Sequence, residues 1–198
     1  MNPGQFPHDL DPAQAGRIRR GGRPVPSAFP GLGVLAAALL CLGATVAGGP
    51  HLITARNGRS RLELPAGWRF RPYLNATADL QVADVQHKSF LIVLSEPKPA
   101  VNHLSLEAQS DIALATIVAR MEGVEATSGP VEMMIGGHRA LRYEFRGRIE
   151  GVKVAYIHTT IEGRETFHQI VAWTTPSRLK KNRAVIEAVI ASFREVGP

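Results

Sequence analysis

Residues 131–148 read VEMMIGGHRALRYEFRGR, and this stretch decides the fold. The Gly136-Gly137 pair predicts a tight turn between two extended segments, 131–135 and 140–148. Large apolar side chains alternate with charged ones across 141–146 (LRYEFR). Because successive side chains of a strand point to opposite faces, this alternation predicts one face on the core and the other in water.

Two further strands follow this hairpin and continue the meander. We expect them at 152–161 and 166–174, because both stretches are rich in β-branched and aromatic residues. Glu150-Gly151 and Glu162-Gly163 mark the two turns. Four consecutive antiparallel strands therefore form the centre of the predicted sheet.

The part of the chain before this meander predicts two more hairpins. The first joins 51–55 to 60–64 around Asn57-Gly58, a dipeptide that favours a primed hairpin turn. The second joins 80–85 to 89–94. The apolar run FLIVL at 90–94 is continuous, which is typical of a strand buried on both faces.

A helix is expected over 105–122, between the second hairpin and the meander. Ser105 can cap it, and Gly123 follows its last residue. Its buried stripe is expected at Leu114, Ile117, Val118 and Met121, which recur at helical spacing.

A second helix is expected after the last strand, beginning at Thr175 with Pro176 in its first turn. Its inner face is expected at Ile186, Val189, Ile190 and Phe193. These elements together predict an α+β fold with an antiparallel sheet between helices, an α/β/α sandwich, over residues 51–198.

The order of these elements resembles the PsbP-like domain family, in particular its small exported bacterial members. The similarity is carried by Leu64–Trp68 (LPAGW), the Gly136-Gly137 turn with Ala140 and Tyr143 after it, Ala172–Thr174 and Ser192–Arg194. It covers about residues 52–195. The resemblance implies an antiparallel sheet sandwiched by helices and a role as assembly factor, extrinsic subunit or binding module, with no shared catalytic residue.

The start of the chain predicts export. Residues 1–30 contain six prolines and few large apolar side chains, and are expected to be a disordered leader. Residues 31–49 carry no charge and follow Arg17, Arg19, Arg20 and Arg23. A basic flank before an apolar run is what export machinery and the positive-inside rule recognise. The domain after it is therefore expected in the periplasm, or outside the cytoplasmic membrane and anchored to it.

Three interpretations of residues 31–49 stay open. The run is just long enough to span a bilayer as an uncleaved transmembrane anchor. Alternatively it is a signal peptide, since Thr45, Ala47 and Gly48 offer small residues around a cleavage site after Ala47. The third interpretation is that Met1 is not the true start.

Composition narrows the chemistry of the exported part. The exported part contains no cysteine, because the single cysteine of the chain, Cys41, lies in the apolar run. It therefore forms no disulfide bond, and we expect packing alone to stabilise it. Nineteen Lys and Arg against fifteen Asp and Glu give this part a charge of +4, which does not indicate a nucleic-acid partner. No phosphate-binding, dinucleotide, nucleophile-elbow or zinc-helix motif occurs. We expect no cofactor, no metal and no catalytic residues.

Histidines offer an alternative to this view. His158 and His168 fall on two strands joined by a hairpin. They would lie directly opposite each other only with a three-residue loop, 162–164, and a two-residue loop would turn them to opposite faces. A hydrolase or metal-dependent enzyme with a site at these two histidines is the competing hypothesis.

One group of charges predicts a contact with a partner. Arg178, Lys180, Lys181 and Arg183 crowd the first turns of the last helix, where the helix dipole disfavours cations. The functional interpretation is contact with an anionic partner, either an acidic cell-envelope protein or an anionic membrane surface. The alternative interpretation is that these four cations lie at a solvated helix start and contact no partner. The sequence therefore favours a non-catalytic binding or assembly module at the cell envelope, of open oligomeric state.

Overall fold

The computed structural model describes residues 49–197, apart from the side chains of 126 and 127. The leader 1–30 and nearly all of the apolar run 31–49 lie outside the described residues. Within residues 49–197, no helix is both long enough and apolar enough to cross a membrane.

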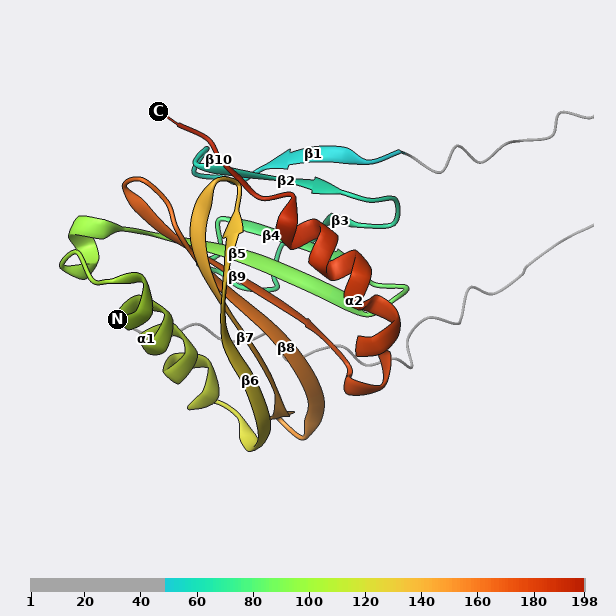
Figure 1. Ribbon diagram of the computed structural model, residues 1–198. Helices are drawn as coiled ribbons and strands as arrows, with labels where there is room; N and C mark the ends of the chain where they lie inside the picture. Colours follow the sequence, from blue (N-terminus) through green and yellow to red (C-terminus); the bar gives the residue numbers. More distant parts are fainter. Residues whose placement is uncertain (1–48, 198) are drawn as a thin grey trace, which may run out of the picture. The chain divides into compact units, whose positions relative to one another are not determined.

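Two antiparallel sheets build the domain (Figure 1). The small sheet has the order β1-β2-β10, and the large one has the order β3-β4-β5-β9-β8-β7-β6. The strands of the small sheet are β1 (His51–Thr54), β2 (Ser60–Leu64) and β10 (Arg194–Glu195). The strands of the large sheet are β3 (Arg69–Phe70), β4 (Leu80–Asp84), β5 (Ser89–Pro97), β6 (Glu122–Ile135), β7 (His138–Ile149), β8 (Val152–Glu162) and β9 (Thr166–Thr174).

Two α-helices cover opposite faces of the large sheet. Helix α1 (Leu106–Val118) begins after Ser105, whose side chain accepts a hydrogen bond from the Ala108 amide, and a short 3₁₀ helix η1 (Lys98–Val101) precedes it. Helix α2 (Pro176–Ala191) packs with the small sheet on the other face. Strand alternation separates the two layers, since Ile157 and Ile170 face α2 whereas Tyr156 and Val171 face α1.

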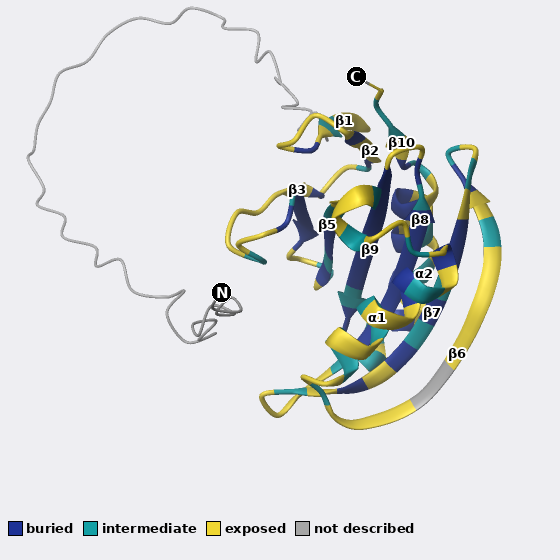
Figure 2. Ribbon diagram, turned by 90° about the vertical axis from the view of Figure 1, so that its left-hand side faces the viewer, coloured by how far each residue is buried: buried dark blue, intermediate teal, exposed yellow. Residues whose placement is uncertain are grey.

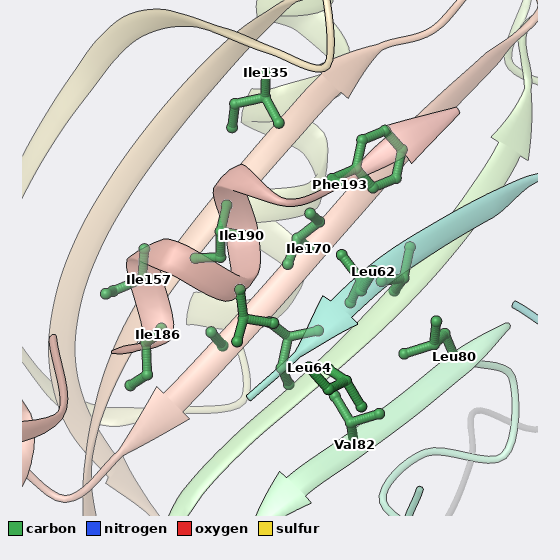
Figure 3. Packing of buried hydrophobic residues seen from close by; sticks show 14 of the residues in the cluster. Leu62, Leu64, Leu80, Val82, Ile135, Ile157, Ile170, Ile186, Ile190 and Phe193 are labelled. Carbon is green, nitrogen blue, oxygen red and sulfur yellow. The ribbon is translucent and has the colours of Figure 1, made fainter. Parts of the chain in front are cut away.

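The larger hydrophobic core lies between the large sheet, the small sheet and α2 (Figure 3). Leu62 and Leu64 of β2 enter it from the small sheet, and Ile186 and Ile190 enter it from α2. Phe193, just beyond α2, is fully buried there. Figure 2 shows the buried central strands between these covering elements.

Most predicted elements are confirmed, including both hairpins before the meander, the four meander strands and both helices. The α+β class is confirmed. One correction concerns the first hairpin, which forms a separate sheet with β10. Strands β3 and β10 were not predicted, because two residues of extended chain carry no periodicity.

Two further predictions need correction. The first helix ends at Val118, and the chain then enters β6, which begins at Glu122 and not at 131. All four residues of the predicted stripe, Leu114, Ile117, Val118 and Met121, pack against the core as expected, but each of them is only half-buried. The fully buried side chains of α1 are instead Leu106, Gln109 and Ser110.

The strand β7 also departs from its predicted wet face. Arg142 and Glu144 are half-buried, because α2 lies over that face of the sheet. Charged residues there pair with charged residues of the helix, as described below.

Candidate functional site

Strand β6 does not pair evenly with β7, and this opens a hollow. The register shifts three times between Glu122 and Val131. Gly129, at φ 115°, lies so close to β7 that an added Cβ would meet the Arg142 carbonyl oxygen at 2.5 Å. Irregular pairing of this kind leaves part of a strand away from its partner.

A hollow of about 290 Å³ lies beside this irregular pairing, where Leu179 of α2 approaches the sheet. Its lining residues are Glu125, Ser128, Glu144, Phe145, Arg146, Tyr156 and Leu179. The Tyr156 side chain belongs to the cluster on the α1 face, where burial raises its pKa to about 12.

A smaller hollow of about 100 Å³ shares Glu125 and Arg146 with the first. It is also lined by Pro176, the first residue of α2. The other lining residues are Gly123, Gly147, Arg148 and Lys153. Each hollow is lined by one residue from the first turns of α2, Leu179 or Pro176, and we call the two together the basic hollow.

Cations from three elements border the basic hollow. Arg146 and Arg148 come from β7, and Lys153 comes from β8. Within residues 49–197, none of these three takes part in an ion pair. Arg146 lies opposite Glu125, and Arg148 opposite Glu122, in the register of the β6–β7 ladder, but neither side-chain pair forms an ion pair. The charges of Arg148 and Lys153 are therefore available to an anionic ligand, whereas Arg146 also helps to lower the pKa of Glu144, which lines the larger hollow.

The predicted cluster on α2 divides in the structure. Arg183 binds Glu144 of β7 with both Nη atoms, at 2.6 and 2.7 Å, and Glu187 at 3.1 Å. These hydrogen bonds from Arg183 lower the pKa of Glu144, and the same contact raises the pKa of Arg183. Arg183 is thus held within the fold.

The other three cations of the cluster form no ion pair within residues 49–197. Lys180 and Lys181 are exposed, and Arg178 is half-buried. Lys180 follows Pro176 by four residues and precedes Arg183 by three, so it lies on the same stripe of α2 as these two residues, although it lines neither hollow. Lys181 lies on the adjacent, outer stripe, three residues after Arg178.

The sheet separates His158 from His168. The β8–β9 ladder pairs His158 with Val171, and Ile161 with His168. The last pair of this hairpin is Glu162 with Phe167, so residues 163–166 lie between the paired strands. This is longer than either the two-residue or the three-residue loop that the sequence suggested. His158 faces α1, where its Nε2 lies 2.7 Å from Gln169 Oε1, and His168 faces the small sheet. The two histidines cannot share a ligand, so the geometry does not support the hypothesis of an enzyme site formed by both of them.

His168 belongs to another polar cluster that the sequence did not predict. Its Nδ1 lies 3.0 Å from Ser95 Oγ, and its Nε2 lies 3.4 Å from Glu195 Oε1. His138 Nε2 lies 3.3 Å from the other oxygen of Glu195. The backbone amide of Arg164 also donates to this carboxylate, at 3.2 Å.

This cluster joins residues from β5, β7, β9 and β10, far apart in the sequence. His168 is fully buried and packs against the Phe193 ring, 5.0 Å away between ring centroids. Within the described part of the chain, no group of three or more His, Cys, Asp or Glu is arranged to hold a metal ion. The cluster attaches the carboxyl-terminal strand to the large sheet.

Comparison with known proteins identifies the fold. No model of a known protein family matches the chain, and no curated protein sequence matches it. Among solved structures, the cyanobacterial PsbP of Synechocystis sp. PCC 6803 (CyanoP) is similar, with a TM-score of 0.56 at 13% identity over 79% of this chain and 97% of that one. The Saccharomyces cerevisiae Ran-binding protein Mog1p is similar with a TM-score of 0.50 at 11% identity, over 74% and 95%.

The chain therefore has the PsbP-like fold, as its sequence motifs predicted. At these identities the similarity concerns the fold alone.

Proposed function

We propose that this protein is a non-catalytic binding module of the cell envelope, and that it takes an acidic segment of a partner protein at the basic hollow. The observation that carries the proposal is the grouping of Arg146, Arg148 and Lys153 around the smaller hollow of about 100 Å³, which Pro176 of α2 also lines, with Arg146 shared by the larger hollow of about 290 Å³.

The shape of the hollow favours a protein segment over a flat membrane surface. A concave site can surround a carboxylate side chain and remove it partly from water, which strengthens its attraction to the surrounding cations. A bilayer surface reaches only the cations that project outward. Mog1p, whose fold is similar, is itself a Ran-binding protein, so a PsbP-like domain is compatible with a protein-binding role.

The polar groups of the described residues argue for binding rather than catalysis. Ser95, His168 and Glu195 are in contact, but His168 is wholly buried and none of the three lines either hollow. Hydrolysis needs a nucleophile and a base next to a space that a substrate can occupy. Their contacts explain instead how β10 is held.

The location outside the cytoplasm rests on the sequence. Four arginines precede the uncharged run 31–49, and no cysteine follows it. A fusion of alkaline phosphatase after residue 60 is expected to be active, because that enzyme acquires its disulfides only after export. An inactive fusion, together with an active cytoplasmic reporter at the same junction, would place the domain inside the cell.

Binding at the hollow is tested with the full chain in mild detergent and a fluorescein-labelled oligoglutamate peptide. The informative variant is Arg148→Gln with Lys153→Gln, which removes two charges that line the smaller hollow. Its matched control is Arg164→Gln with Lys181→Gln, which removes the same charge elsewhere. We expect about tenfold weaker binding for the first, since two charge contacts contribute roughly 0.7 kcal/mol each. The control should differ from wild type by less than about twofold.

Salt gives a second readout for the same complex. Binding of the peptide should weaken between low salt and about 0.15 M, where the Debye length is about 8 Å. Equal losses in the two double variants would show a general charge effect, and the hollow would then not be the site.

A further inference from the structure

We propose that residues 69–73 (RFRPY), here called the interfacial loop, seat the domain on an anionic bilayer beside the apolar run. The loop comprises β3 and the three residues after it. This inference rests on the location outside the cytoplasm that is part of the proposed function, and it takes in addition the run 31–49 as a retained membrane anchor. It adds a second contact, with lipid, to the protein contact at the basic hollow.

The aromatic residues of the domain carry the first argument. Among residues 49–197, Phe70 and Tyr73 are the only aromatic side chains that are exposed, at 53% and 79%. All the other aromatic residues of this part are buried or half-buried. Phe and Tyr at a surface, next to arginines, form the composition that partitions into the headgroup region of a bilayer.

The charges of the interfacial loop carry the second argument. Arg69 and Arg71 flank Phe70, and neither forms an ion pair within the described part of the chain. Arg69 Nη1 donates to the Trp68 carbonyl oxygen at 2.7 Å, which leaves its other donors available. The loop contains no acidic residue. Phosphate groups of anionic lipids complement such a surface.

The fold holds the loop in an outward position. Trp68 before it is buried, at 1% exposure, and Leu74 after it packs against the core on the α1 face. The Arg71 amide donates to Gln81 of β4 at 3.0 Å. Tyr73 has φ 87°, a region that a bulky side chain rarely adopts. A residue kept in such a conformation at the surface suggests a functional reason for its position.

Chain connectivity carries the last argument. Pro50 alone separates the apolar run from His51, so His51 lies within about 7 Å of the end of that run. His51 pairs with Leu64 in the small sheet, and the Trp68 amide closes a tight turn on the Pro65 carbonyl oxygen. Arg69 is therefore within about 15 Å of Leu64. A bilayer that holds the run is close to the interfacial loop.

The test places an indole in the loop and measures its contact with lipid. The full chain carrying Tyr73→Trp is reconstituted into phosphatidylglycerol-containing vesicles with brominated acyl chains, which quench indoles that enter the bilayer. The matched control is Val152→Trp, at the first residue of β8, where Val152 is 59% exposed. Wild type, with Trp68 and Trp173, supplies the background. We expect strong quenching for Tyr73→Trp and none above background for Val152→Trp.

A second pair of measurements identifies the lipid chemistry. Adding Arg69→Gln and Arg71→Gln to the Tyr73→Trp chain should at least halve its quenching on anionic vesicles. On pure phosphatidylcholine the added changes should have little effect. Absence of quenching at position 73 on anionic vesicles, or equal quenching at position 152, would overturn the proposal. The vesicle result is independent of the oligoglutamate and phosphatase experiments, so failure of the proposed function is recognised separately.

Discussion

Arg183 holds Glu144 with both ends of its guanidinium group, with Nη1 2.6 Å from Oε1 and Nη2 2.7 Å from Oε2. The contact joins α2 to β7 on the face of the sheet that the sequence alternation had assigned to water. It explains the position of one of the four cations that the helix dipole disfavours. It also lies next to the basic hollow, which Glu144 lines.

Breaking this ion pair should cost stability. In a double-mutant cycle with Arg183→Gln and Glu144→Gln, we expect a coupling free energy of about 1 kcal/mol at pH 7, limited by solvent because the arginine is partly exposed. Arg183 lowers the pKa of Glu144 in the folded state, so the coupling is present above the unfolded pKa and is lost as pH falls through the folded one. Denaturant unfolding at pH 7 and at pH 3 measures both. A coupling of zero at pH 7 would contradict the prediction, whereas Lys181→Gln should change stability by less than about 0.5 kcal/mol.

Truncating Phe193 should strongly destabilise the domain. The side chain is fully buried between α2, the small sheet and the large sheet. Phe193→Ala is expected to lower the free energy of unfolding by about 3–5 kcal/mol, through lost burial and the cavity left behind. Phe70→Ala, at a position 53% exposed, is the matched control and should cost less than about 1 kcal/mol. Equal thermal melts for the two variants would mean that the segment after α2 is not part of the core.

The sequence predicted the elements whose periodicity is long. In β7 the alternation of Leu141, Tyr143 and Phe145 with charged residues was sufficient, and all three are buried. Helix α1 was located by Ser105, but its contacts were predicted less well. Its buried side chains include Gln109 and Ser110. These polar side chains can be buried because they form hydrogen bonds with Glu96 and Thr160, respectively. Such a pairing depends on the tertiary structure and leaves no local pattern.

The candidate site could be predicted only in part. The cations of α2 were evident, but the division between Arg183 and Lys180 depends on Glu144, which lies 39 residues from Arg183. The hollow lies beside the register shifts of β6, and no turn motif in the sequence indicates where those shifts occur. The placement of His158 and His168 depended on the register of a single hairpin, since a shift by one residue exchanges the faces.

Gly163 is expected to tolerate no side chain. A Cβ added there would meet the Thr166 carbonyl oxygen at 2.6 Å and would also collide with the Glu195 carboxylate. Because the carbonyl belongs to the backbone of β9, it cannot move without disturbing the ladder. Gly163→Ala should therefore cost about 1–3 kcal/mol and weaken the attachment of β10. Gly197→Ala, with nothing within 4 Å, should leave the unfolding midpoint unchanged. Hydrogen exchange at the Arg164 amide, which binds Glu195, would report loss of the attachment directly.

Acidification should destabilise the domain through its two buried histidines. Burial lowers the pKa of His158 below its usual 6.5, because this effect is larger than that of the hydrogen bond with Gln169, which raises the pKa. Burial also lowers the pKa of His168, although the nearby Glu195 raises it in part. Both imidazoles therefore take up a proton less readily in the folded state than in the unfolded chain, which binds protons below about pH 6.5. The full stability is present above this pH and is lost as pH falls through the window between the unfolded and folded pKa values. The limit is about 1.4 kcal/mol per pH unit for each histidine.

The two histidines can be separated by their contacts. His158 Nδ1 is buried without a hydrogen-bond partner in the described part of the chain, so a proton added there finds no acceptor. His168 faces the Glu195 carboxylate, which offsets part of the cost of charging it. His158→Gln should therefore reduce the pH dependence of unfolding between pH 7.5 and 5 more than His168→Gln does. Denaturant titrations at three pH values measure the slopes. Identical unfolding free energies at pH 7.5 and 5 in the wild type would show that neither imidazole is kept neutral by the fold.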